Sequence, residues 1–525
     1  MMEVMDAAHG TSRLSEKTSR ALRLRERWDR LPLLMVLVLY TVVVLRCAWI
    51  SDDAYITFRT VDNFAAGYGL TWNTAERVQA FTHPLWALLL SATYMLTREI
   101  HVTTLALSAG LSALAVLLYA AALAPTPLTA TVGVTIFLMS KSFVDYSTSG
   151  LENPLSHLLL ALYLLVLLRR APSNGRLFIL ALLGGLVTLN RMDLVLLVLP
   201  GLLVAWYQRR GIRAAGTLLL GFAPFLLWEA FSLFYYGFLF PNTAYAKLNT
   251  DLPAGALIRQ GLCYLLSSLN MDPLTPLILA TGLLLPFIIR QRRCMPVSVG
   301  IALYLVYVVA VGADFMAGRF LTAPLLCAVV VLSQSPAARS PRALLIVLAL
   351  VIITGLASPH PPPLSTDRYG ANERYIDAHG VGDERAFYYP ATGLLLAVRG
   401  APVPDHSWAW IGRDVRRESP AVYVAQNVGF LGFEAGPAVH IVDLYALAEP
   451  LLARLPYRAT ADWRIGHFRR SLPEGYLETL RGGQNVIADR RIASLYDALA
   501  LITRGRLLDP QRLAAIVRLN TGLEL

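Results

Sequence analysis

The chain has 525 residues, of which 56% are hydrophobic and only 15% are charged. Its mean hydropathy of +0.52 excludes an ordinary soluble protein and is typical of a protein that crosses a membrane many times. A formal net charge of +11 would suggest nucleic-acid binding in a soluble protein. Here much of the basic charge lies in short segments between apolar runs, where it sets orientation in the bilayer. We therefore expect a lipid bilayer as a partner and no nucleic acid.

The first apolar run, residues 31–50, is long enough to cross a bilayer. No small-residue cleavage site follows it, so we interpret it as a retained helix rather than a signal peptide. The segment before it, residues 1–31, is rich in arginine, which places this N-terminal segment in the cytoplasm. Ser51 then emerges on the far side of the membrane.

Ten further apolar runs follow along the chain: 102–123, 129–141, 155–168, 176–189, 194–207, 214–236, 272–289, 294–312, 320–333 and 341–357. The segment 84–96 is too short for a comfortable span, and counting it as a crossing would break the alternation of the loops. We interpret it as a helix that enters the membrane without crossing. These runs predict an α-helical polytopic membrane protein with about eleven transmembrane helices, and a membrane domain over residues 32–357.

The links between the runs alternate in character. One set is basic and is predicted to be cytoplasmic: 169–176, 208–213, 290–293 and 337–342. The other set mixes acids, amides, glycines and aromatic residues, and falls on the same side as Asp52: 141–154, 190–193, 237–251 and 312–319. The charged tetrapeptide 190–193 joins two short runs, which favours a water-filled cavity open to the outside, or else a tight turn with an Arg–Asp pair.

The composition changes near His360, where three prolines indicate a linker and no spanning run follows. Residues 358–525 are enough for one soluble domain, with strands predicted at 421–424 and 438–442. Helices are predicted at 492–503 and 509–518. We expect a C-terminal α+β domain outside the cytoplasm.

Two adjacent carboxylates, Asp52 and Asp53, stand directly after the first apolar run. Such a pair is costly at the mouth of a membrane helix unless it faces water, a partner or a substrate. We interpret it as a catalytic pair; the alternative is a solvated helix end. The recurrence of Tyr55, Phe58 and Phe64 predicts a helix over 53–66 that lies on the membrane surface.

Polar and charged residues recur in the predicted outer loops. They are His83 in the first loop, and Glu152, Arg191, Asp193, Asn242, Lys247, Asp314 and Arg319 in the later ones. Singly, Glu152 and Asp314 could cap helices and Lys247 and Arg319 could anchor the chain at the interface. Together they converge on one membrane face while the other face carries only basic links, which favours a functional cavity.

The chemistry of such a cavity follows from its charges. A carboxylate can remove a proton from an alcohol as its oxygen attacks. Lysine and arginine can hold a phosphate and stabilise the charge that develops as it leaves. The combination suits attack by a hydroxyl on a sugar carried by a lipid phosphate, because the space outside a plasma membrane lacks nucleotide sugars as a rule.

Several ordered motifs carry a family resemblance. They are 52–59 (DDAYITFR), 76–79 (ERVQ), 82–86 (THPLW), 149–153 (SGLEN), 241–244 (PNTA), 314–319 (DFMAGR), 435–437 (AGP), 441–443 (IVD) and 463–470 (WRIGHFRR). The acidic pair resembles the GT-C class of polyprenyl-phosphate-sugar glycosyltransferases. The ordered set, from about residue 48 to 476, is similar to the terminal β-(1→2)-arabinofuranosyltransferases that finish mycobacterial cell-wall arabinan.

The resemblance implies a role for each matching residue. Asp52 would activate the acceptor hydroxyl in an inverting displacement. Asp53 would orient substrate or hold a divalent cation, and no other cofactor is implied. Substrate contacts would come from Tyr55, Arg59, His83, Glu152, Arg191, Asp193, Asn242 and Asp314, with Lys247 and Arg319 at the donor phosphate. The outer domain would guide the acceptor through Trp463, Arg464 and His467, although Trp463 could equally be part of a core.

The resemblance therefore implies a membrane glycosyltransferase of the plasma (inner) membrane, with its active site outside the cytoplasm. It would transfer a sugar, D-arabinofuranose first, from a decaprenyl-phosphoryl-arabinofuranose type donor to a cell-envelope glycan. Open alternatives are another polyprenyl-phosphate sugar, a protein acceptor, a transporter or flippase for a lipid-linked sugar, and an assembly protein without catalysis.

Overall fold

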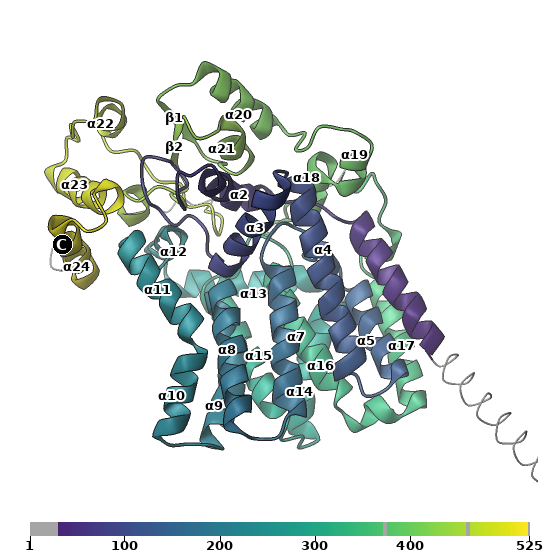
Figure 1. Cartoon of the computed structure of the whole chain (residues 1–525). Coiled ribbons are helices and arrows are strands. Elements are labelled where there is room, and N and C mark those ends of the chain that lie inside the picture. Colours follow the sequence, from purple (N-terminus) through teal and green to yellow (C-terminus); the bar gives the residue numbers. More distant parts are fainter. Residues whose placement is uncertain (1–29, 371–374, 458–462, 523–525) are drawn as a thin grey trace, which may run out of the picture.

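The computed structural model describes residues 30–370, 375–457 and 463–522 (Figure 1). The predicted cytoplasmic N-terminal segment, 1–31, therefore lies almost wholly outside the described residues. The described chain is mostly helical and contains one sheet of two strands.

The predicted apolar runs form helices that stand side by side in the lower part of Figure 1. They are the described helix 30–46, α3 (Pro84–Thr97), α4 (His101–Leu118) continued by η1 (Tyr119–Leu123), α5 (Pro127–Met139), α7 (Asn153–Arg169), α8 (Asn174–Asn190), η2 (Met192–Leu194) with α9 (Val195–Tyr207), α10 (Ile212–Gly221), α11 (Ala223–Tyr235), α14 (Leu274–Ile288), α15 (Met295–Ala310), α16 (Thr322–Ser333) and α17 (Pro341–Leu356). Neighbours in the bundle include α4 with α7, α7 with α8, and α9 with α15.

Length and composition alone identify few complete spans among the described residues. One helix, His101–Leu123, qualifies, and up to three do if each of two bent pairs is one span. The first pair, Ile212–Gly221 and Ala223–Tyr235, bends by 60°, so the run predicted at 214–236 is broken beside Pro224. In the second, α13 (Ala254–Met271) meets α14 at 116°. The other apolar helices have 10–17 residues, and about eleven crossings stays a prediction.

The upper part of Figure 1 holds the first outer loop and the C-terminal third of the chain. The helices outside the bundle are α2 (Asp52–Ala65), α6 (Lys141–Asp145), α12 (Asn242–Leu248), η3 (Arg319–Leu321), η5 (Pro362–Leu364), α18 (Glu384–Thr392), α19 (Leu394–Val398), α20 (Ser407–Glu418), α21 (Phe430–Ala435), η6 (Leu452–Arg454), α22 (Tyr476–Gly482), α23 (Arg490–Arg504) and α24 (Pro510–Thr521). Strands β1 (Val422–Ala425) and β2 (His440–Asp443) pair in parallel, with Val422 opposite His440. Both predicted strands and both predicted C-terminal helices are confirmed.

Helix α2 forms where it is predicted, but it does not lie on a surface. Most of its residues are buried, and it packs against α3 on one side and α21 on the other. The Tyr55 ring meets Phe430 and Phe433 edge-on, with centroids 4.7 and 5.3 Å apart. The prediction of a surface helix is therefore wrong, because its aromatic face is covered by an element nearly 400 residues further along the chain.

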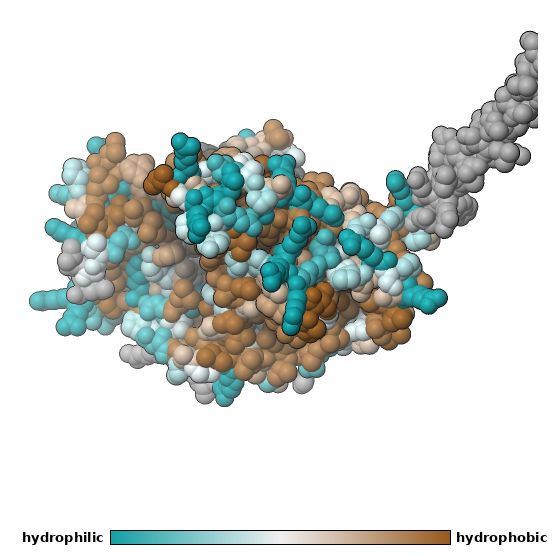
Figure 2. Space-filling view, turned by 90° about the horizontal axis from the view of Figure 1, so that it is seen from below, coloured by the Kyte–Doolittle hydropathy of each residue, from teal (hydrophilic) through white to brown (hydrophobic). Residues whose placement is uncertain are grey.

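The basic links do gather at one end of the bundle. Gln334 Nε2 and Arg169 Nη2 both donate to the Leu123 carbonyl, at 2.8 and 3.1 Å, and Gln291 Nε2 donates to the Gln334 carbonyl at 2.6 Å. Arg176 Nη1 donates to Gln208 Oε1 at 3.2 Å, which connects the basic link 169–176 to the link 208–213. Figure 2 views the molecule from below and shows hydrophilic side chains gathered among hydrophobic ones. Exposed arginines at this end include Arg169, Arg209, Arg292 and Arg339, the last of which ends η4 (Pro336–Arg339).

The outer elements and the helical bundle share one hydrophobic core. Buried residues as distant as Trp49, Phe143, Tyr388 and Phe430 belong to the same cluster. A boundary at 357/358 between two domains therefore stays a prediction. In the fold, the loop after the first helix packs between the bundle and the C-terminal elements.

Candidate active site

Asp52 occupies the first turn of α2, and its carboxylate also meets the start of α21. Ser51 caps α2, its Oγ accepting from the Ala54 N–H at 3.3 Å. Asp52 Oδ1 accepts from the Phe430 N–H at 2.7 Å and Oδ2 from the Gly429 N–H at 3.2 Å. Burial raises the pKa of Asp52 to about 7, although these two N–H groups act in the opposite direction. Asp52 is therefore a positioned carboxyl that can take up a proton near neutral pH.

Asp53 has different surroundings. It is half-buried and accepts no hydrogen bond from the residues that the structure describes. Burial raises the pKa of Asp53, and the positive charges of Lys247 and Arg319 oppose that rise. The Asp53 carboxylate thus faces two cations while Asp52 faces backbone amides.

Both acids line a small cavity of about 30 Å³ between α2 and the C-terminal elements. Polar side chains from Gln426, Asn427 and His467 share this lining with the Phe315 ring. The His467 ring lies edge-on to Phe315, with centroids 4.5 Å apart. Burial, followed by the charge of Arg464, lowers the pKa of His467 to about 4, so its imidazole is neutral at pH 7. The cavity therefore offers carboxylate, amide and imidazole groups to a polar ligand.

Glu152 is the centre of a buried charge network. Its carboxylate receives Arg191 Nη1 at 2.8 Å, Arg319 Nη2 at 3.3 Å and His83 Nδ1 at 3.2 Å. Thr57 Oγ1 of α2 lies 2.8 Å from His83 Nε2, which links the network to the helix of the acidic pair. Burial alone would raise the pKa of Glu152, but the positive charge of Arg319 holds it well below its usual range.

The network also includes both remaining predicted acids. Asp193 accepts from Arg191 at 2.7 and 3.0 Å, and Asp314 Oδ2 lies 3.5 Å from Arg319 Nη1. The Glu152 side chain makes no capping hydrogen bond to α7, so the capping alternative does not hold for it. The Arg–Asp pair expected for a tight turn is present, but at 13% and 9% exposure Arg191 and Asp193 are mostly buried, and Arg191 also contacts Glu152.

Lys247 differs from Arg319 in having no carboxylate partner among the described residues. It is half-buried on α12, and its Nζ lies 6.0 Å from the centroid of the Phe315 ring. Because Phe315 lines the cavity of Asp52 and Asp53, the ammonium stands at the edge of that cavity. Arg319 is instead paired with Glu152 and Asp314, whereas Lys247 has no ion pair in the described chain and senses only the longer-range charge of Asp53, so it is a candidate ligand for an anion.

Three predicted site residues hold the scaffold together. Tyr55 Oη lies 3.0 Å from His101 Nδ1 in the core. Arg59 donates to the Trp72 and Val439 carbonyls at 2.7 and 2.9 Å, and also to the Gly432 carbonyl. Asn242 Nδ2 donates to the carbonyls of the loop after β2, the nearest at 2.9 Å. Their contacts tie the first outer loop and α12 to the C-terminal elements.

Of the two other residues predicted in the outer domain, Arg464 lies near the cavity, with its Cζ 5.2 Å from the centroid of the Phe315 ring. Arg464 Nε donates to the Gly380 carbonyl at 2.8 Å, while its Nη2 is buried without a hydrogen-bond partner in the described chain. Trp463 is half-buried and stacks on Phe468, with centroids 6.3 Å apart. Packing accounts for Trp463, whereas Arg464 keeps an unused donor.

No protein-family model matches the chain. Two curated relatives are similar to it, and both are named terminal beta-(1->2)-arabinofuranosyltransferase. The one from Mycobacterium tuberculosis is 28% identical over 81% of this chain and 81% of its own length. The one from Corynebacterium glutamicum is 26% identical over 80% of this chain and 72% of its own. The predicted resemblance is confirmed. With it, the prediction of a glycosyltransferase is confirmed as well.

Solved structures give weaker likenesses. ArnT from Cupriavidus metallidurans bound to undecaprenyl phosphate has a TM-score of 0.45 and 14% identity, covering 92% of this chain and 88% of that one. The oligosaccharyltransferase of Archaeoglobus fulgidus has a TM-score of 0.44 and 12% identity, covering 78% of this chain. The chain spans only 62% of that second structure.

The arabinofuranosyltransferase motifs do not include one acid that the structure places near the pair. Glu384 begins α18 and is 8% exposed. Burial, and next the negative charge of Asp53, raises the pKa of Glu384 well above its usual range. Its position beside Asp383 in a polar stretch carries no local pattern that sequence analysis could use, because its proximity to Asp53 arises only from the fold.

Proposed function

We propose that this chain is an inverting membrane glycosyltransferase that moves D-arabinofuranose from a polyprenyl-phosphate donor to a hydroxyl of a cell-envelope glycan. The observation that carries the proposal is the pairing of Asp52 and Asp53 in one cavity beside the unpaired ammonium of Lys247. The names of the two similar relatives support the choice of sugar and linkage.

Asp52 is the proposed general base. The acceptor hydroxyl gives its proton to the Asp52 carboxylate as its oxygen attacks the anomeric carbon from the face opposite the phosphate. The two backbone N–H groups at α21 hold the carboxylate in place. Because its pKa lies near 7, this carboxyl is ionised enough to act and basic enough to accept the proton.

Lys247 is the proposed ligand of the donor phosphate. As the bond from the anomeric carbon to the phosphate oxygen breaks, negative charge grows on the departing polyprenyl phosphate. An ammonium that is not held in a close ion pair can stabilise that charge. Asp53 stands within the field of Lys247 and Arg319 and would orient these cations or hold a divalent cation with the phosphate.

The placement in the membrane is part of the proposal. The acid-bearing loops and C-terminal elements would lie outside the plasma membrane and the basic links inside it. The outer elements around Arg464 and His467 would then receive the acceptor glycan, since Arg464 has an unused buried donor and His467 lines the cavity.

The test uses the full chain purified in detergent and a panel of polyprenyl-phosphate sugars, with arabinofuranose first. We expect acceptor-dependent release of polyprenyl phosphate and a new β-(1→2) linkage in the product. Asp52→Asn should lower turnover at least about 100-fold, the lower end for a lost general base. The asparagine oxygen can accept the Phe430 N–H but not the Gly429 N–H as well, so the unfolding temperature is measured alongside turnover and should fall only slightly.

Asp62→Asn is the matched control. Asp62 lies on the same helix and accepts from Tyr94 Oη at 2.7 Å, outside the cavity. The Asp62→Asn variant should transfer sugar at the wild-type rate. Near-normal turnover by Asp52→Asn, or transbilayer movement of the donor without any release of polyprenyl phosphate, would defeat the proposal, the second result in favour of a transporter.

A further inference from the structure

We propose that Glu76, His440 and Glu449 form a binding site for a divalent transition-metal ion of the zinc type. This group, here called the Glu76 site, does not line the cavity of Asp52 and Asp53. Its role would be to fasten the first outer loop to the C-terminal elements. The inference is independent of the reaction that the cavity performs.

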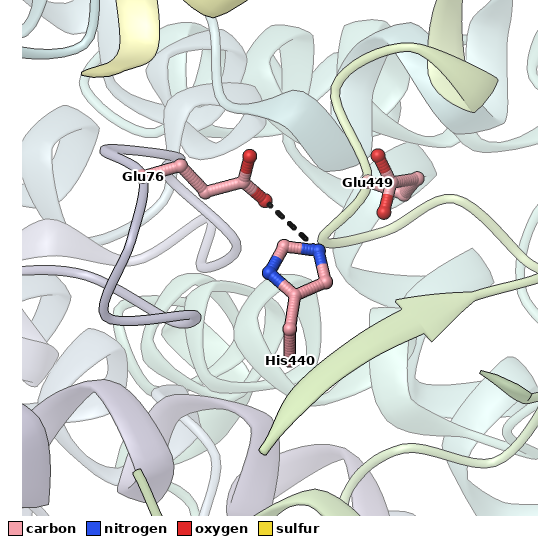
Figure 3. Close-up of side chains that lie close together, drawn as sticks. All are labelled: Glu76, His440 and Glu449. Atoms are coloured by element: carbon pink, nitrogen blue, oxygen red, sulfur yellow. Dashed lines mark ion pairs between the residues drawn. The ribbon is translucent and has the colours of Figure 1, made fainter. Parts of the chain in front are cut away.

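The three side chains present their ligand atoms to one another. One ligand atom from each lies within 4.8 Å of the others, and this is the one such group of three in the described chain. Figure 3 shows the two carboxylates and the imidazole converging, with His440 Nε2 and Glu76 Oε1 4.0 Å apart. Glu76 and Glu449 are 3% and 1% exposed, so neither acid is simply solvated.

Neighbours hold both carboxylates: Glu76 Oε1 accepts from Asn73 Nδ2 at 3.5 Å, whereas Glu449 is held through one oxygen only. Arg504 Nη2 donates to Glu76 Oε2 at 3.1 Å, and Tyr476 Oη donates to Glu449 Oε1. The second oxygen of Glu449 is buried and has no hydrogen-bond partner among the described residues. A buried carboxylate oxygen without a hydrogen-bond partner costs free energy. Around metal ligands, neighbouring side chains commonly fix one oxygen of a carboxylate and leave the other free to bind the ion.

The distances and ligand types favour zinc. Around a tetrahedral zinc ion with bonds of about 2.0–2.2 Å, two ligand atoms stand about 3.3–3.6 Å apart, so side-chain rotations must close the group by up to about 1 Å. An imidazole with two carboxylates suits zinc or a similar transition metal, whereas magnesium and calcium prefer oxygen ligands alone. Water would complete the coordination.

The ligands come from separated parts of the chain. Glu76 lies between α2 and α3, His440 begins β2, and Glu449 follows β2. Their holders, Tyr476 and Arg504, begin α22 and end α23. A bound ion would therefore join the wall that carries the acidic pair to the elements that cover it, and the binding free energy would add to the stability of the fold.

The experiment measures zinc binding by the full chain in detergent after metal removal with a chelator. We expect one zinc ion per chain by mass spectrometry and a rise in unfolding temperature on addition of zinc chloride. Glu449→Gln and His440→Gln should weaken zinc binding at least about tenfold, and Tyr476→Phe, which removes only an outer contact, about 10–100-fold.

Matched variants keep the result specific. Glu434→Gln, which changes a partly exposed acid paired with Arg413, should bind zinc like the wild type. The Asp53→Asn variant should also bind zinc like the wild type. This result would distinguish the Glu76 site from any cation bound at the acidic pair. Cobalt added to the wild-type chain should give a visible ligand-field spectrum, a readout that needs no variant. Substoichiometric zinc in the wild type, unchanged binding by Glu449→Gln, or the spectrum of aqueous cobalt would each overturn the proposal.

Discussion

At the scale of single residues, two neighbouring acids have opposite surroundings. Asp52 accepts two backbone N–H groups, while Asp53 accepts none from the described chain and faces Lys247 and Arg319. Different environments assign different roles to carboxyl groups of the same type. The pattern DD at 52–53 predicts a pair but cannot say which member does what, because the amides that distinguish them lie in α21.

The pH dependence of transfer should report Asp52. A base must be unprotonated to act, so turnover should fall about tenfold per pH unit below about 7 and level off above it. For stability the sign is reversed. Because burial raises the folded-state pKa, the contribution of Asp52 to folding is full below about 4 and is lost as the pH rises toward 7. A pH–rate profile checks the predicted fall in turnover. An acid limb centred below pH 5 would contradict the assignment of Asp52 as the base.

The two cations should respond differently to removal. Lys247→Gln breaks no ion pair with a described acid, so it should weaken donor binding about 10–100-fold, as for a lost hydrogen bond to a charge, and leave stability unchanged. Arg319→Gln removes the ion-pair partner of buried Asp314 and one of the three partners of Glu152, and should lower the free energy of unfolding by about 3 kcal/mol. Donor titration and thermal unfolding measure both, and equal destabilisation by the two variants would refute the distinction.

At the scale of elements, most helix positions were predictable and their burial was not. The apolar runs at 102–123 and 341–357 contain no interruption, and both form helices close to those limits. Helix α13 escaped prediction because polar residues such as Arg259 and Gln260 interrupt its apolar pattern. The burial of α2 depends on α21, and no local pattern in either segment indicates that they pack together.

The contact between α2 and α21 depends on a glycine. A Cβ added to Gly429 would lie 1.9 Å from the Asp52 carbonyl oxygen and 2.6 Å from its carboxyl carbon. Gly429→Ala should therefore push α21 away, remove the hydrogen bonds on Asp52 and lower transfer at least about tenfold. Gly482→Ala, where an added Cβ meets nothing within 4 Å, is the control in a turnover assay. Wild-type turnover by Gly429→Ala would show that the amides of α21 are dispensable.

At the scale of the whole molecule, the loops that carry both acids and bases lie at one end of the bundle and the purely basic links lie at the other. The sequence predicted this sorting from the alternation of its loops, and the structure brings Glu152, Arg191 and Arg319 together at one end and the basic links at the other. The shared core of bundle and outer elements was not predictable, since composition alone suggests a linker near His360.

The proposed orientation can be tested in intact cells. In a chain whose four cysteines are replaced, Asp251→Cys should react with a membrane-impermeant thiol reagent, whereas Arg292→Cys should react only after the membrane is opened. Both positions are exposed, so accessibility rather than burial decides the result. Labelling of Arg292→Cys in intact cells would reverse the orientation.

The two hydrogen bonds on Asp52 also set an order of events during synthesis. The residue emerges from the ribosome long before Gly429 and Phe430, so early in translation its carboxylate lacks the amides that hold it. A polypeptide released ahead of position 429 would keep all its bundle helices and still be catalytically silent. If Asp52 is the base, as proposed, competence for transfer would be gained only after α21 is made, which would protect the cell from reaction by half-made chains.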